Sequence, residues 1–94
     1  MALQSFRCRE TEALFRLQRT RRWRGIEAVA LRKLRLMHAA VDLQDLRMPP
    51  GNRLEALHGD RAGQYSIRVN AQWRVCFVWT PQGPAEVEIV DYHH

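Results

Sequence analysis

The period of the hydrophobic pattern changes once along the chain, at residues 48–52 (MPPGN). Before this segment, apolar residues recur every three or four positions, which places their side chains on one face of a helix. After it, they recur every second position, as in a strand with one buried face. Pro and Gly interrupt both kinds of element. We therefore expect helices first and strands afterwards, with the boundary at this segment.

Helical periodicity marks two segments of the first half. Residues 10–18 (ETEALFRLQ) fit a helix with Thr11 as a possible N-terminal cap. Residues 24–43 have the pattern of a long amphipathic helix. The expected apolar stripes are Ala13, Leu14 and Leu17 in the first segment, and Ile26, Ala30, Leu34, Met37 and Val41 in the second. Residues 2–6 (ALQSF) allow a short strand before both helices.

Two strand-like segments, 64–70 (QYSIRVN) and 73–79 (WRVCFVW), follow each other closely, and parity selects the length of the turn between them. A two-residue turn would place apolar residues opposite polar ones. A turn at residues 70–72 instead pairs apolar residues throughout: Val69 with Trp73, Ile67 with Val75, and Tyr65 with Phe77. The same register makes Arg68 and Arg74 neighbours on the other face of the hairpin.

Residues 86–90 form a third strand-like segment, after a turn rich in Gly and Pro (TPQGPA). If Val87 and Ile89 join the apolar face of the hairpin, Tyr92 falls on the face that carries the two arginines. Asp91 then points towards the helices or the rim of the sheet. The polar end of this strand is therefore a candidate for delivering reactive groups to a site.

These patterns predict an α+β fold in two layers. Two N-terminal helices pack on one face of an antiparallel sheet of about four strands. The whole chain, residues 1–94, is expected to form a single domain. The other face of the sheet, with its arginines and tyrosine, is expected to be open.

Positive charge is concentrated in the first half of the chain. Residues 1–48 carry eleven Lys or Arg against five Asp or Glu, whereas residues 49–94 carry four against five. Arginine supplies fourteen of the fifteen cations, and its planar fork of donors suits phosphate. Such a surface fits a nucleic acid, an acidic protein partner, or simply a solvated basic face.

The sequence gives little support for a membrane protein, a secreted protein or a metal-binding protein. No apolar run approaches ~18 residues, and the Arg-rich start lacks the apolar region of a signal peptide. Cys8 and Cys76 have no metal-type spacing and are too few for a disulfide framework, which favours an intracellular, reduced protein. The adjacent His93 and His94 are poor joint ligands for one metal ion. We expect no metal and no cofactor.

The face that carries the arginines has the residue types needed to cleave RNA without metal. In that reaction the 2′-hydroxyl attacks the adjacent phosphate, which requires a base, an acid and cations for the developing charge. Arg68 and Arg74 can neutralise the phosphate, unless they extend to water or pair with an acidic residue. His93 can transfer protons near neutral pH, and Tyr92 can stack on a base or bind the phosphate. His58 can approach the same face or is a surface residue.

Long motifs resemble the HigB-like toxins of bacterial toxin–antitoxin modules, which belong to the RelE/ParE superfamily and are also called plasmid-maintenance killer proteins. Residues 49–79 (PPGNRLEALHGDRAGQYSIRVNAQWRVCFVW) and 87–94 (VEIVDYHH) carry most of the resemblance. TEALF, TRRW and the long helical segment extend it to nearly the whole chain.

The resemblance implies a function as well as a fold. HigB-like toxins are ribosome-dependent endonucleases that cut mRNA in the decoding site of the small subunit of the 70S ribosome, without metal. A HigA-like helix-turn-helix antitoxin neutralises them, and operator DNA is bound only through the antitoxin complex. A cytoplasmic protein without membrane association is implied. The basic first half of the chain then becomes a candidate for contact with ribosomal RNA.

The resemblance also assigns roles to residues. Arg74 of QWR is expected at the scissile phosphate, and Arg68 of SIRVN matches a basic strand position that related toxins use there. Tyr92 and His93 of DYH resemble the C-terminal catalytic pair of the family, with His93 in proton transfer and Asp91 assisting. Which group is the general base and which is the general acid is left open.

The chain departs from the family pattern at His58. The family commonly has Lys in the sequence LKGD, where this chain has LHGD. A histidine is in general fully charged only below a pH of ~6.5, so weaker or more pH-sensitive cleavage is expected. Two alternatives remain: a ParE-like inhibitor of DNA gyrase, and a weakened toxin that acts mainly through antitoxin and operator binding.

Overall fold

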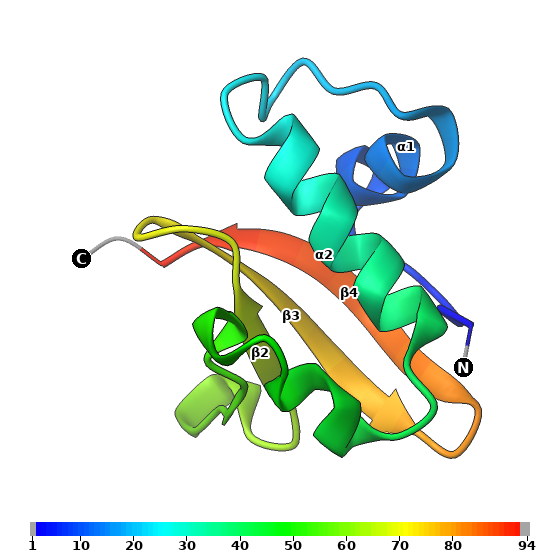
Figure 1. Ribbon diagram of the computed structural model, residues 1–94, viewed down its shortest axis with the longest axis vertical. Helices are drawn as coiled ribbons and strands as arrows, with labels where there is room; N and C mark the ends of the chain where they lie inside the picture. Colours follow the sequence, from blue (N-terminus) through cyan, green and yellow to red (C-terminus); the bar gives the residue numbers. More distant parts are fainter. Residues whose placement is uncertain (1, 93–94) are drawn as a thin grey trace.

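Two helices and four strands make up the computed structural model, which describes residues 2–92. The elements are α1 (Arg9–Leu17), α2 (Glu27–Ala39), β1 (Glu55–Ala56), β2 (Tyr65–Arg68), β3 (Trp73–Thr80) and β4 (Gly83–Asp91), with 3₁₀ turns at Leu43–Arg47, Pro50–Asn52 and Gly59–Arg61. The strands form one antiparallel sheet in the order β1-β2-β3-β4, and both helices cover one face of it (Figure 1). The predicted α+β architecture is confirmed. No helix in this part of the chain is long and apolar enough to cross a bilayer.

The apolar stripe of α2 forms the centre of the helical layer. Ala30, Leu34 and Met37 are fully buried, as the sequence predicts. The prediction is wrong at Val41, which lies beyond the end of the helix and is 67% exposed. The helix ends earlier than expected because Asp42 begins a separate 3₁₀ turn, with a capping box that holds its first residues.

Two expectations for α1 are corrected. Leu14 is buried as predicted, but Leu17 is 66% exposed, because it is the last helical residue and Gln18 turns the chain in a left-handed conformation. Thr11 is not a cap. It lies fully buried within the first turn, and its hydroxyl accepts a hydrogen bond of 3.1 Å from the backbone N–H of Ile89 in β4.

The register of the β2–β3 hairpin is the one selected by parity. The paired residues are Tyr65 and Phe77, Ser66 and Cys76, Ile67 and Val75, and Arg68 and Arg74. Asn70 stabilises the three-residue turn, because its side-chain oxygen accepts hydrogen bonds of 2.8 Å from the N–H groups of Gln72 and Trp73. The helix-facing side chains of the hairpin, Ile67, Val75 and Phe77, are fully buried.

Strand β4 is longer than the sequence predicted, because only two residues separate it from β3. Its pairing with β3 shifts at a bulge near Glu86, which has a left-handed backbone (φ 54°). Beyond the bulge, Val75 pairs with Ile89 and Arg74 pairs with Val90. Alternation from Val90 places Tyr92 on the arginine side of the sheet, as expected.

The outer edge of β4 is covered by the start of the chain. Three backbone hydrogen bonds join residues 4–7 to β4, and Phe6 makes a single parallel bridge with Val87. The short strand allowed by residues 2–6 is therefore present only as this bridge. Together with Thr11, the segment satisfies backbone groups that an edge strand would otherwise leave unpaired.

Candidate active site

The sheet face opposite the helices carries the polar side chains of the strands. We call it the polar face and define it by Ser66, Arg68, Arg74, Cys76, Glu88 and Tyr92. The expectation that this face is open is wrong in part: Ser66 and Cys76 are fully buried, and Arg74 is only 8% exposed. Residues 53–61 supply the contacts that cover this part of the sheet, as the interactions of Arg74 and Glu88 show.

Asn52 fixes the path of the covering segment. Its buried side-chain amide donates to the carbonyls of Leu46 and Met48, both at 3.2 Å, and its Oδ1 accepts from Lys33 Nζ. Burial, and to a smaller extent the charge of Arg32, lowers the pKa of Lys33. The segment that reads as a simple breaker in the sequence is therefore anchored to α2.

Arg53 follows directly and adopts a left-handed backbone (φ 46°). Its carbonyl accepts a hydrogen bond of 2.6 Å from Arg74 Nη2. The anchored segment thus delivers a backbone acceptor to the polar face. A nearly buried guanidinium needs such partners to offset its lost hydration.

Arg74 is held from several sides. Its Nε donates to Ser66 Oγ at 2.7 Å, and its Nη2 lies 3.6 Å from a carboxylate oxygen of Glu55 in β1. The guanidinium carbon lies 5.6 Å from the centre of the Tyr92 ring, within range of a cation–π interaction. Of the alternatives for this arginine, pairing with a glutamate is therefore realised, through Glu55.

Arg68 lies directly opposite Arg74 in the hairpin and is half-buried. Like charges that face each other destabilise a sheet by several tenths of a kcal/mol. Glu55 lies opposite Ser66 in the neighbouring strand pair and offsets part of this repulsion through its ion pair with Arg74. Strands β1, β2 and β3 thus place one glutamate and two arginines next to each other on the polar face.

A second ion pair attaches the loop after β1 to the sheet. Arg61 Nη1 donates to a carboxylate oxygen of Glu88 at 2.8 Å and to Gln64 Oε1 at 3.0 Å. The hydrogen bond to Glu88 raises the pKa of Arg61. Cys76, the pairing partner of Glu88, is buried, and burial raises the pKa of its thiol to about 11.

The structure brings together three of the six residues predicted for the site, namely Arg68, Arg74 and Tyr92. Asp91 lies at the exposed rim, where it accepts a hydrogen bond of 3.1 Å from Gln72 Nε2. His58 is exposed and directly precedes the 3₁₀ turn Gly59–Arg61. Within residues 2–92, no hydrogen bond or ion pair joins its side chain to Arg68, Arg74 or Tyr92. His93 lies outside the described residues.

Sequence reasoning missed Glu55, Arg61 and Glu88. Alternation in the last strand places Glu88 on the face of Tyr92, so parity provides a signal for that residue. No periodic signal exists for Glu55 and Arg61, which come from a two-residue strand and a 3₁₀ turn. No group of three or more His, Cys, Asp or Glu side chains in the described part of the chain is placed to hold a metal ion.

A small α+β domain that holds an arginine beside a tyrosine on one sheet face belongs to the class of proteins suited to bind an anionic group. Comparison with known proteins identifies the family. The family model described as "RelE-like toxin of type II toxin-antitoxin system HigB" matches residues 4–93, and the chain therefore belongs to the HigB-like toxin family.

Two curated relatives match parts of the chain. Toxin HigB-1 of Vibrio cholerae is 52% identical over 55 residues, which is 58% of this chain and 58% of that protein. An uncharacterized protein of Haemophilus influenzae is 45% identical over 49 residues, 52% of this chain and 48% of that protein. The chain thus spans about half the length of the curated relatives that it matches.

Proposed function

We propose that this toxin inhibits translation by cutting mRNA in the decoding site of the small subunit of the 70S ribosome, without metal or cofactor. One observation carries the proposal: Arg74 is fixed beside Tyr92 on a single sheet face, with Arg68 opposite it. A cation held before the reaction begins stabilises developing charge without the cost of reorganisation.

The proposed chemistry uses the arginines and the tyrosine of the polar face together with His93 and Asp91. The 2′-oxygen of one nucleotide attacks phosphorus, the bond to the 5′-oxygen of the next nucleotide breaks, and the products are a 2′,3′-cyclic phosphate and a free 5′-hydroxyl. A base takes the proton of the 2′-hydroxyl, and an acid supplies one to the leaving oxygen. We propose Arg74 and Arg68 as the phosphate cations, Tyr92 and His93 as the catalytic pair, and Asp91 as an assisting group.

On this proposal, a phosphate that binds Arg74 replaces the carboxylate of Glu55 as its ionic partner. This carboxylate is half-exposed and lies 3.6 Å from Arg74 Nη2, whereas Ser66 and the carbonyl of Arg53 hold the same guanidinium at shorter distances. The carboxylate can turn to water when a phosphate arrives, while the two shorter contacts keep the arginine oriented. His58 is proposed as a further group that can approach the phosphate from the loop after β1.

The proposed partners follow from the class of toxin. A HigA-like helix-turn-helix antitoxin neutralises the protein, and operator DNA is contacted only through that complex. The proposed location is the cytoplasm, where ribosomes and mRNA are present.

The proposal is tested by translating a defined mRNA on purified ribosomes and mapping the new 5′ ends. The wild type should produce codon-phased cuts, and Arg74→Ala should lower the cleavage rate by about 10²–10³-fold, as expected for loss of a preorganised charge. Tyr92→Phe should also slow cleavage, and it avoids the buried contacts of Arg74 if that variant is unstable. Arg35→Ala on the exposed surface of α2 is the matched control. Cuts that persist unchanged in both site variants would rule out this site.

A second candidate is a weakened toxin that acts mainly through antitoxin and operator binding. It is favoured by the internal partners that already engage Nε and Nη2 of Arg74, and by His58 in place of the usual lysine. Absence of cuts together with intact antitoxin binding would support it. Absence of cuts together with inhibition of DNA gyrase would point to a ParE-like activity instead.

A further inference from the structure

The loop between the two helices holds the densest positive charge in the chain. Arginines occupy positions 19, 21, 22 and 24, and all four are exposed. We propose that this arginine loop, residues 19–24, is a second binding surface for the phosphate backbone of RNA, outside the candidate active site. The inference rests on the proposed function, because it assigns the loop to the same RNA-bound complex.

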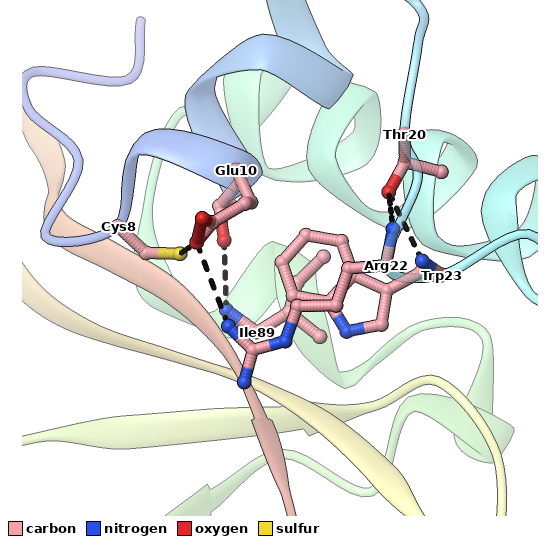
Figure 2. A network of polar contacts seen from close by, with 7 residues as sticks. Cys8, Glu10, Thr20, Arg22, Trp23 and Ile89 are labelled. Carbon is pink, nitrogen blue, oxygen red and sulfur yellow. Dashed lines mark hydrogen bonds and ion pairs between the residues drawn. The ribbon is translucent and has the colours of Figure 1, made fainter.

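The backbone of the arginine loop is fixed from within. Thr20 Oγ1 accepts hydrogen bonds from the N–H groups of Arg22 at 3.1 Å and of Trp23 at 3.0 Å (Figure 2). The Trp23 side chain is only 2% exposed and belongs to the hydrophobic core. Because the backbone is already ordered, binding by the arginines costs less conformational entropy than binding by a flexible basic tail.

The loop borders a hollow of about 790 Å³. Its lining consists of residues 18–22 together with Glu10, Ala13 and Glu27. Arg22 pairs with Glu10 at 3.5 Å, but both side chains are more than half exposed, so this contact is weak. No ion pair within residues 2–92 involves the arginines at positions 19, 21 and 24. Most of the charge on the loop is therefore available to an external anion.

The arginine loop packs on the helix-facing side of the sheet, opposite the polar face. The ring of Trp23 meets that of Trp73 edge-on at 6.2 Å, and Trp73 immediately precedes Arg74. Figure 2 shows the ion pair between Arg22 and Glu10, and the hydroxyl of Thr11, the next residue of α1, accepts a hydrogen bond from the N–H of Ile89 in β4. Tyr92 follows Ile89 by three residues, about 10 Å along a strand. Arg74 and Tyr92 point to the opposite face of the sheet from Trp73 and Ile89, so an RNA chain that contacts both the site and the loop has to pass around the end of the strands.

The chemistry of the surface favours RNA over a protein partner. Arginine forks match phosphate oxygens and need no particular base, so they bind any sequence. Protein interfaces usually centre on a large apolar or aromatic anchor, whereas Ala13 is the only apolar side chain among the described residues that line the hollow, and Trp23 is buried in the core. The phosphates can belong to mRNA that flanks the cut or to ribosomal RNA, and the experiment separates these two sources.

The test removes three charges from the loop by Arg19→Gln, Arg21→Gln and Arg24→Gln, and keeps Arg22 because of its contacts with Glu10 and Trp23. The matched control removes three exposed arginines elsewhere, by Arg9→Gln, Arg32→Gln and Arg35→Gln. One probe is a fully 2′-O-methylated 12-nucleotide RNA, which has no nucleophile and is not cut. The other probe is the 70S ribosome without mRNA. Thermal unfolding verifies that both variants are folded.

The loop variant should bind at least one probe about tenfold more weakly near 0.1 M salt, and the slope of log K against log salt should fall by about 2, at ~0.7 per phosphate contact for single strands. The control variant should lose much less. A loss confined to the oligonucleotide identifies flanking mRNA, and a loss confined to the ribosome identifies ribosomal RNA. Glu10→Gln should act in the opposite direction, because it releases Arg22.

Equal binding of the loop variant and the control variant to both probes would overturn the inference. Unchanged RNA binding with loss of antitoxin binding would overturn it in favour of an acidic protein partner. Since neither probe is cleaved, these outcomes are independent of the nuclease proposal. Normal loop-dependent binding without any mRNA cleavage would count against the proposed function alone.

Discussion

The two faces of the sheet are built from alternate residues of the same strands, yet they are buried in different ways. The helix-facing side of the β2–β3 hairpin is entirely apolar, and the regular elements α1 and α2 cover that face. The polar face is also buried around Ser66, Arg74 and Cys76, but by an irregular segment. Apolar burial needs only shape and area, whereas a buried cation needs each of its donors matched.

Stability and chemistry therefore depend on alternate residues of the same strands. Substitutions on the helix-facing side should act mainly on the free energy of unfolding. Substitutions on the polar face should act on cleavage, with smaller effects on stability. Four variants test this separation, in order of decreasing effect on stability.

Phe77→Ala should have the largest effect. The ring is fully buried between the helices and the sheet, and replacing such a residue with alanine costs about 3–5 kcal/mol of unfolding free energy. Urea unfolding monitored by tryptophan fluorescence measures the change. A loss below about 1 kcal/mol would mean that the helix-facing side is not the main source of stability.

Ser66→Ala on the polar face should cost less. It leaves Arg74 Nε without its acceptor, a loss of about 1–3 kcal/mol for a buried donor. Because the arginine is then less firmly oriented, cleavage should fall by more than the stability change explains. Ser66→Thr, which keeps the hydroxyl, is the control and should retain cleavage if the larger side chain is accommodated.

Cys76 should stabilise the fold at neutral pH and lose this contribution at high pH. Burial raises the pKa of this thiol from 9.0 to about 11, so the folded state holds the proton more tightly than the unfolded state does. Its contribution is therefore complete below pH 9 and is lost as the pH rises through about 11. Unfolding curves between pH 7 and 11 for the wild type and Cys76→Ala should diverge less as the pH increases. A constant difference would contradict the raised pKa.

His58→Lys should leave stability unchanged, within about 0.5 kcal/mol, because the side chain is exposed. Cleavage of ribosome-bound mRNA should rise, because lysine brings a positive charge throughout the neutral range. Rates measured from pH 6 to 8 provide the check. Equal or lower rates across this range, with intact folding, would show that His58 does not attenuate the toxin.

Much of the candidate site could be predicted from local pattern. The register that pairs Arg68 with Arg74 follows from alternation alone, since a slip of one residue would expose the whole apolar side of the hairpin. Alternation also places Tyr92 on the same face. The roles in cleavage remain predictions for all six residues: Arg74, Arg68, Tyr92, His93, Asp91 and His58.

The remaining contacts could not be predicted, because their partners are distant in the chain and lie in segments without periodicity. Arg74 meets the carbonyl of Arg53, 21 residues away, and Thr11 meets the amide of Ile89, 78 residues away. The polarity of Thr11 suggested a helix cap, but tertiary packing made it the partner of an edge strand.

The sequence by itself determined the order of the elements, the pairing of the hairpin and the side of the sheet to which each side chain points. Those properties depend on the helical and strand periods and on the cost of exposing apolar surface. Only the tertiary structure decided how the polar face is covered. Asn52 anchors the path of an irregular segment, and that path determines which carbonyl and which carboxylate meet Arg74.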